Sequence, residues 1–335
     1  MFYAKIRCII NPALSSDMEK IEHPYASNSA FSGVLDKNIK KLEKRLGISL
    51  SIRGNSIILD GTEEKVKFAK NYFDQLKHFK NKDRPLQSED FHIALDLLEN
   101  GQTNDLGDFT LPKSLNLSRK SVRPKSLNQH NYIQAIKSND LVFGIGPAGT
   151  GKTYLAMASA LLSLQNKEVT RIILTRPAVE AGEKLGFLPG DLQQKVNPYL
   201  RPLYDALYDL APSEQATNFI EKGIIEIAPL AFMRGRTLNS AFIILDEAQN
   251  TTKEQMKMIL TRSGFDSKLI ITADITQIDL PQPHKSGVLQ ALKILSGIKE
   301  IAFIKFNEKD VVRHPLVQKI IKAYEKAENK PKKNK

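Results

Sequence analysis

Cysteine is nearly missing from this sequence of 335 residues, in which Cys8 is the single example. A disulfide within the chain needs two cysteines, and a zinc site built on thiolates needs several. The sequence therefore excludes both of these features. A reducing compartment fits this cysteine usage, so we expect a cytoplasmic protein.

Long apolar runs are missing as well. No stretch approaches the roughly 20 apolar residues that a membrane-spanning helix needs. Lys5 and Arg7 lie near the N-terminus, but the apolar pair Ile9 and Ile10 is too short for the apolar region of a secretory signal peptide. We therefore expect no membrane partner and no secretion.

Acidic residues are fewer than basic ones. The chain has 49 lysines and arginines against 37 aspartates and glutamates, which gives a net charge of +12. Such an excess suits a polyanionic partner such as RNA, although it also aids solubility. Hydrophobic residues make up 41% and charged residues 26%, as in a soluble globular protein, and the length leaves room for roughly two domains.

The most specific motif is the glycine-rich stretch GPAGTGKT, which fits the phosphate-loop pattern G-x-x-x-x-G-K-[ST]. An apolar run over 141–145 precedes it, and a helix-like segment over 154–162 follows. The glycines let backbone N–H groups turn toward phosphate oxygens, and the following helix offers the positive end of its dipole. We expect Lys152 to reach the β- and γ-phosphates and the Thr153 hydroxyl to bind Mg²⁺. The candidate nucleotide-binding residues are Gly146, Pro147, Ala148, Gly149, Thr150, Gly151, Lys152 and Thr153.

A second signal is the apolar run 242–245, which predicts a buried strand ending at two adjacent acids, Asp246 and Glu247. Mg²⁺ prefers oxygen ligands, so we expect Asp246 to hold the ion directly or through water. Glu247 would then orient and partly deprotonate an attacking water. The alternative is two surface acids at the start of a helix.

A third signal is the apolar run 269–273, which is followed by Asp274 and, three residues later, by Gln277. Gln277 would contact the γ-phosphate or the attacking water and report hydrolysis to the rest of the protein. The alternative is an amide that only caps a loop.

The order of apolar runs predicts an α/β fold. Helix-like segments separate most of the strands, which favours right-handed crossovers and a largely parallel sheet. Ligands bind such sheets at the carboxyl ends of the strands, so the phosphate loop, Asp246 and Asp274 should meet at one site. The expected strands are 141–145, 171–174, 224–227, 242–245, 269–273 and 301–306.

Residues 35–76 show a compact α-β-β-α pattern, in which alternating apolar residues flank a turn at Gly54. This order resembles part of a KH-type RNA-binding domain. The Gly-x-x-Gly loop that clamps nucleotides in that fold is not evident before Ile39. The pattern leaves open whether this unit binds RNA or serves packing and assembly.

Several motifs also carry a family resemblance. Residues 246–249, the pair Asp274 and Gln277, and the upstream Gln129 resemble motifs of superfamily-one helicases, which implies that Gln129 reads adenine. Longer runs resemble the PhoH-like family, named for phosphate-starvation induction, from about Asn128 to Ala323. This resemblance implies a RecA-like P-loop ATPase that is cytoplasmic, helicase-like and linked to RNA metabolism. The runs that carry it are 146–153, 175–183, 233–237 and 310–315.

These patterns divide the chain into four parts. A small KH-like α/β domain over 1–80 and a basic linker with one short helix over 81–127 precede the ATPase core at 128–323 and a basic, disordered tail at 324–335. The linker has no acidic residue between Asp108 and Asp140, so it could follow a phosphate backbone or act as a solvated tether.

The chain has room for one ATPase core only. Superfamily-one helicases complete the ATP site with an arginine from a second core. The missing arginine would therefore come from a neighbouring subunit or from an unusual local position. We expect a ring-like homo-oligomer such as a hexamer, with Arg313 as the first catalytic candidate and Arg234, Arg236 and Arg262 as alternatives. A surface or structural ion pair is an equally open role for each of them.

The segment after the expected strand 171–174 is polar and rich in turns. In helicase-like cores this segment touches single-stranded nucleic acid, so Thr175 and Arg176 are candidate contacts. The equal alternative is an oligomer interface.

The expected function is Mg²⁺-dependent ATP hydrolysis coupled to RNA binding or remodelling, with local unwinding as one form of it. The alternatives are an ATP-driven switch or chaperone that unwinds nothing, and phosphoryl transfer to a small acceptor. The adjacent acids Asp246 and Glu247 favour water as the acceptor. A guanine-reading Asn-Lys-x-Asp motif is missing, which disfavours a GTPase.

Overall fold

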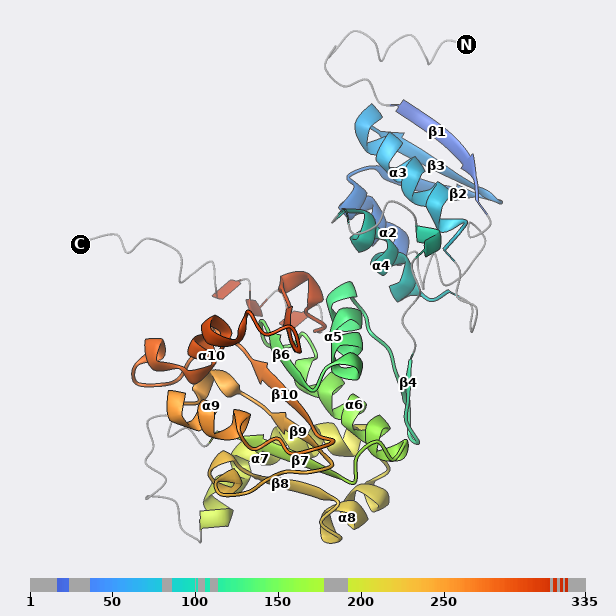
Figure 1. Ribbon diagram of the computed structural model, residues 1–335. Helices are drawn as coiled ribbons and strands as arrows, with labels where there is room; N and C mark the ends of the chain where they lie inside the picture. The colour runs from blue at the N-terminus through green and yellow to red at the C-terminus, as the bar shows by residue number, and fades with distance from the viewer. Residues whose placement is uncertain are drawn as a thin grey trace, which may run out of the picture. The chain divides into compact units, whose positions relative to one another are not determined.

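The computed structural model describes residues 17–23, 37–79, 86–99, 101, 106–108, 114–177 and 192–313, with 316–317, 320–321 and 323–324. The chain divides into two compact units. The first comprises 1–112 and 125–127, and the second comprises 113–124 and 128–335. Figure 1 labels the elements of both units. Within the described ranges, every helix is too short or too polar to span a lipid bilayer.

The first unit is a small α/β structure with an antiparallel sheet. Its strands β1 (Asp17–Glu22), β2 (Ser49–Arg53) and β3 (Ser56–Gly61) are arranged in the order β1-β3-β2. The helices are α2 (Lys37–Leu46), α3 (Glu63–Leu76) and α4 (Ser88–Glu99), followed by the 3₁₀ turn η2 (Leu106–Asp108). The α-β-β-α order expected from the sequence is therefore present, and β1 is an additional strand.

The expected linker over 81–127 is divided between the two units in the structure. Helix α4 contributes Phe91, Ile93 and Leu95 to the core of the first unit, and the Tyr72 hydroxyl donates to the carbonyl of Phe91 at 2.8 Å. The short hairpin of β4 (Leu115–Asn116) and β5 (Ser121–Val122) belongs instead to the core of the second unit. The composition of residues 81–127 indicated only a basic linker. The structure shows that the apolar residues scattered through it are buried, and these residues decide which unit each part packs into.

The second unit is built on a six-stranded sheet. Its strand order is β11-β6-β10-β9-β7-β8, and every neighbouring pair is parallel. The fold is the expected RecA-like P-loop core, in which another strand lies between the phosphate-loop strand β6 and the acidic strand β9. The strands are β6 (Leu141–Ile145), β7 (Arg171–Arg176), β8 (Ile225–Pro229), β9 (Ala241–Leu245), β10 (Lys268–Ala273) and β11 (Ile301–Lys305).

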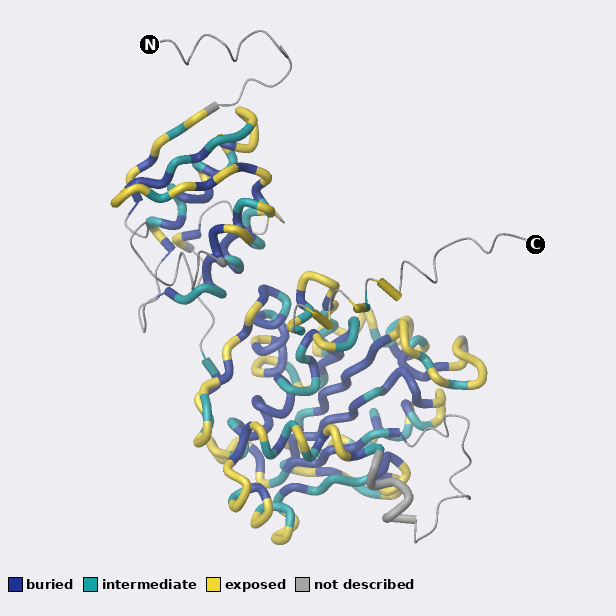
Figure 2. The backbone as a smooth tube through the Cα atoms, turned by 180° about the vertical axis from the view of Figure 1, so that it is seen from behind, coloured by how far each residue is buried: buried dark blue, intermediate teal, exposed yellow. Residues whose placement is uncertain are grey.

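Helices cover both faces of this sheet, and the strands form an almost continuous buried layer in Figure 2. Alternate residues of a strand point to opposite faces. In β9, Phe242 and Ile244 pack with α6, α7 and α8, whereas Ile243 and Leu245 pack with α9 and α10. The helices are α5 (Leu127–Ser138), α6 (Lys152–Gln165), α7 (Leu192–Leu210), α8 (Ser213–Glu221), α9 (Lys253–Leu260) and α10 (Gly287–Leu295).

Candidate active site

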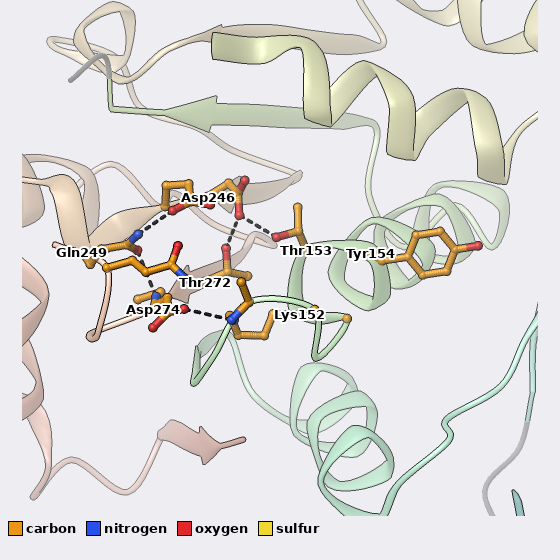
Figure 3. Close-up of a pocket in the computed structure, with 13 residues that line it drawn as sticks. Lys152, Thr153, Tyr154, Asp246, Gln249, Thr272 and Asp274 are labelled. Atoms are coloured by element: carbon orange, nitrogen blue, oxygen red, sulfur yellow. Dashed lines mark hydrogen bonds between the residues drawn. The ribbon is translucent and has the colours of Figure 1, made fainter. Parts of the chain in front are cut away.

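Three parallel strands deliver polar residues to one cavity at their carboxyl ends. The phosphate loop follows β6, Asp246 and Glu247 follow β9, and Asp274 follows β10. Because these strands are neighbours, the three segments line a cavity of about 240 Å³. Figure 3 shows the side chains around it. The convergence predicted from the sequence is therefore present.

The phosphate loop has glycines at two positions that disfavour a side chain, one through close contact and one through its backbone conformation. Gly146 has φ of 152°, and a Cβ at this position would lie 2.6 Å from the carbonyl oxygen of Phe306. Gly151 has φ of 83°, in the left-handed region, and immediately precedes the first residue of α6, Lys152. The loop can therefore pass close to the end of β11 and still turn into the helix.

Lys152 is held inside the phosphate loop. Its ammonium donates to the carbonyl oxygens of Gly146 at 2.7 Å and Pro147 at 2.9 Å. Burial lowers the pKa of Lys152 from its ordinary value, while the carboxylates of Asp274 and Asp246 act in the opposite direction. This cation lies where the backbone of the loop would surround phosphate oxygens.

The two candidate metal ligands lie side by side. The Thr153 hydroxyl donates to Asp246 Oδ1 at 2.6 Å, and the Thr272 hydroxyl donates to the same oxygen at 2.6 Å. Figure 3 shows Asp246 between these two hydroxyls. A hydroxyl beside a carboxylate is the hard oxygen set that suits Mg²⁺ when phosphates and water supply the other ligands. Among the described residues, no cluster of three or more His, Cys, Asp or Glu could hold a metal alone.

Glu247 has an unusual backbone and two partners for its side chain. Its φ of 52° and ψ of 40° place it in the left-handed region, which is uncommon for a residue other than glycine. Its carboxylate accepts a hydrogen bond from the Gln249 amide and lies 3.7 Å from Arg176 Nη2. Burial raises the pKa of Glu247, and the neighbouring Asp246 adds to this, while Arg176 lowers it. A raised pKa makes a carboxylate a stronger base, and so a more effective general base, near neutral pH.

Asp274 anchors the phosphate loop. Its Oδ2 accepts from the backbone N–H of Ala148 at 2.9 Å, and its own N–H donates to Gln249 Oε1 at 3.0 Å. Gln277 lines the cavity, and its backbone N–H donates to the carbonyl of Asp274 at 3.1 Å. The position of Gln277 is therefore compatible with the predicted contact to phosphate or water.

Two residues of the site were given no role from the sequence, although Gln249 lies in the 246–249 motif. Thr272 is a buried hydroxyl in an otherwise apolar strand, and Gln249 is a fully buried amide in the 3₁₀ turn η5 (Ala248–Asn250). A polar residue inside an apolar run is a usable signal, because a buried polar group needs a partner.

Gln129 lies behind the phosphate loop and is not among the residues that line the cavity. It is 3% exposed and donates from Nε2 to the carbonyl of Thr150 at 3.0 Å. This bond supports the loop. The adenine-reading role of Gln129 stays a prediction.

Arg313 lies against the phosphate loop of its own chain. A Cβ at Gly149 would clash with the Nε of Arg313, and the Val312 N–H donates to the carbonyl of Gly149 at 2.9 Å. Arg313 is not among the residues that line the cavity. The role of Arg313 in completing the ATP site, within its own chain or in a neighbouring subunit, stays a prediction.

The alternative arginines are occupied or exposed. Arg236 forms a two-bond pair with Glu226 at 2.6 and 2.7 Å, and Arg262 donates to the carbonyl of Arg236 at 3.2 Å. Arg234 is exposed. The turn-rich stretch 178–191, the pair His314 and Pro315, Cys8 and most of the tail lie outside the described residues.

A phosphate loop after one strand of a parallel sheet, with an acidic pair after the strand two positions away in the sheet, defines a P-loop NTPase. The profile of the family described as PhoH-like protein matches residues 121–325. The chain belongs to this family.

Relatives support this membership over most of the chain. A PhoH-like protein of Bacillus subtilis is 49% identical over 309 residues, which is 92% of this chain and 97% of the relative. A PhoH-like protein of Mycobacterium tuberculosis is 51% identical over 296 residues, 88% of this chain and 84% of the relative. Protein PhoH of Escherichia coli K12 is 46% identical over 198 residues, 58% of this chain and 56% of the relative.

Solved structures resemble the chain more distantly. The large terminase of a thermophilic bacteriophage has a TM-score of 0.38 at 14% identity, with 58% of this chain and 49% of the terminase covered. Pif1 helicase of Candida albicans has a TM-score of 0.32 at 16% identity, with 59% of this chain and 42% of the helicase covered.

Proposed function

We propose that this protein is a Mg²⁺-dependent ATPase whose hydrolysis is coupled to RNA binding or remodelling. One observation carries the proposal: Lys152, the Thr153–Asp246 pair and Glu247 all line one cavity. These groups supply a phosphate-binding cation, oxygen ligands for a metal, and a base for water. Together they are the parts that phosphoryl transfer to water requires.

In this mechanism the phosphate loop binds the β- and γ-phosphates, and Lys152 exchanges its carbonyl partners for phosphate oxygens. Thr153 and Asp246 would hold Mg²⁺, which neutralises charge on the phosphates when it is bound. Glu247 accepts a proton from water as the water oxygen bonds to the γ-phosphorus. The bond from that phosphorus to the β–γ bridging oxygen breaks, which leaves ADP and phosphate.

ATP and RNA are the finer parts of the proposal. The family resemblance implies adenine at Gln129, and the guanine-reading motif is missing from the sequence. The net charge of +12 favours a polyanion, as in proteins that bind a phosphate backbone without regard to sequence. Unwinding of duplexes is a separate activity that hydrolysis alone does not require.

Steady-state hydrolysis of ATP and GTP, with and without single-stranded RNA, tests the proposal. We expect turnover of ATP that rises with RNA, needs Mg²⁺ and falls at least about 100-fold in Glu247→Gln and Lys152→Ala. Exposed Lys67→Ala is the matched control. Turnover that survives both site substitutions would reject the assigned site, and turnover indifferent to RNA would reject the coupling.

The ring-like homo-oligomer and the cytoplasmic location stay predictions. Arg313 lies beside the phosphate loop of its own chain, so a site completed within one chain and a site shared between subunits are both open to test. Sedimentation with ATP and Mg²⁺ measures the assembly directly.

A further inference from the structure

The carboxylate of Glu247 has both oxygens engaged by neighbouring side chains. Oε2 accepts from the Gln249 amide, and Oε1 lies 3.7 Å from Arg176 Nη2. Gln249 is fixed in place, because it is fully buried and its Oε1 accepts from the Asp274 N–H at 3.0 Å. A general base must point a lone pair at the attacking water, and these two contacts hold the carboxylate in its present orientation. The looser contact, to Arg176, is the one that can be exchanged.

Arg176 is placed to respond to an anion. It ends β7, which lies beside β9, and the Asp246 N–H donates to the carbonyl of Thr175 at 2.9 Å. Its Nη1 also donates to the carbonyl of Tyr199 in α7 at 3.2 Å, and its side chain is 22% exposed. A guanidinium binds phosphate through two parallel bonds, so a phosphodiester competes directly with the Glu247 carboxylate.

The neighbouring strand adds an exposed aromatic and an exposed cation at the same edge. Arg176 is in register with Pro229, the last residue of β8. The 3₁₀ turn η4 (Leu230–Met233) follows, where Phe232 is 47% exposed and Arg234 is exposed beyond it. An aromatic platform with basic neighbours is the chemistry that binds single-stranded nucleic acid by stacking and charge.

We propose that Arg176, Phe232 and Arg234 form a contact surface for single-stranded RNA, and that RNA bound at Arg176 displaces its contact with Glu247. When a phosphodiester takes the guanidinium, the Glu247 carboxylate is released from Arg176 and is free to turn toward the attacking water. This inference rests on the proposed ATPase function and names the residue that couples it to RNA. Arg176 is a positioning residue, since it acts through Glu247.

The test is ATP turnover with and without poly(U) RNA in Arg176→Gln and Arg171→Gln, both in the full chain. Arg171 begins the same strand at its opposite end, so its substitution changes charge equally without touching the site. We expect Arg176→Gln to raise turnover without RNA at least about 3-fold and to lose stimulation by RNA. Arg176→Lys should fall between, because one ammonium cannot replace the two-armed contact. Arg171→Gln should retain the wild-type ratio.

The surface itself is tested by Phe232→Ala with Arg234→Gln. We expect the RNA concentration for half-maximal stimulation to rise about 10-fold, which corresponds to the loss of one stacked base. Two results would overturn this inference but not the proposed ATPase function. In the first, Arg176→Gln keeps the wild-type stimulation by RNA. In the second, it loses turnover without RNA while the ratio of turnover with RNA to turnover without RNA is unchanged. Wild-type protein without ATP turnover would instead overturn the proposed function. Circular dichroism melts confirm folding, and Arg176→Lys replaces Arg176→Gln if the latter unfolds.

Discussion

The two adjacent carboxylates Asp246 and Glu247 have different surroundings. Asp246 is 5% exposed and accepts two hydroxyl hydrogen bonds on one oxygen, an arrangement that suits a metal ligand. Glu247 is half-buried, lies on a left-handed backbone and contacts a cation and an amide, which suits a base. The backbone turn at Glu247 thus separates two acids that the sequence places together.

The hydroxyl of Thr272 should matter for metal use. Thr272→Val keeps the shape of the side chain but removes the bond to Asp246. Loss of a group that orients a metal ligand costs about 10–100-fold in metal affinity, so we expect the Mg²⁺ requirement of ATP turnover to rise by about 10-fold or more. Titration of turnover against Mg²⁺ measures this. The exposed Thr261→Val is the control, and equal curves for both variants would contradict the assignment.

His92 should make the first unit sensitive to acid. Its Nε2 is buried without a hydrogen-bond partner among the described residues, and burial lowers the pKa of His92 to about 4, with Lys41 and Arg45 adding to this. An unfolded histidine titrates near about 6.5, so the folded unit binds fewer protons between these values. The neutral, buried His92 therefore lowers the stability of the first unit only in acid: this loss is absent above about pH 6.5 and grows as the pH drops toward about 4.

Replacement of His92 by leucine should remove that loss. Between pH 7.5 and pH 4.5, the free energy of unfolding of the first unit should fall in both proteins. We expect this fall to be about 1–3 kcal/mol smaller in His92→Leu than in the wild type. Hydrogen exchange of α3 and α4 amides in the full chain measures this at both pH values. Equal acid sensitivity in both proteins would mean that another group, such as the buried His23, is responsible.

At the scale of elements, periodicity predicted most of the structure. All six strands of the parallel sheet lie where apolar runs predicted them, because strands inside a covered parallel sheet are rich in apolar residues, whereas the short strands β4 and β5 were missed. Strand β1 was missed because Ile21 is its one buried hydrophobic residue, so it shows no clear alternation. Bonds between distant residues, such as Ala148 N–H to Asp274, could not be read from local patterns.

Helix α4 should stabilise the first unit. Phe91 is 1% exposed within its core, so Phe91→Ala should cost about 3–5 kcal/mol through lost burial and a cavity. Urea unfolding followed by hydrogen exchange of α3 amides measures the loss. Glu89→Ala, in the first turn of the same helix, is the control. A loss below about 1 kcal/mol would instead support the tether that the basic composition of 81–127 first suggested.

At the scale of the whole molecule, one sheet order explains the site. Because β10 lies between β6 and β9, the residue that follows it, Asp274, contacts the phosphate loop on one side and Gln249 on the other. The segment after β11 closes the arrangement, since Asp310 accepts from the Asn128 amide at 2.9 Å and Val312 binds Gly149. The described part of one chain therefore brings Arg313 to its own phosphate loop.

The position of Arg313 beside its own phosphate loop gives a prediction about mixed assemblies. Arg313→Ala and Glu247→Gln should each reduce ATP turnover at least about 10-fold. If Arg313 acts on its own loop, mixing the two variants cannot rebuild a complete site, because each chain lacks one part. We therefore expect turnover of the mixture to equal the sum of its components, after co-expression or denaturation and refolding to exchange subunits. If Arg313 instead served a neighbouring subunit, some interfaces in the mixture would combine an intact Glu247 with an intact Arg313, and turnover would recover well above that sum.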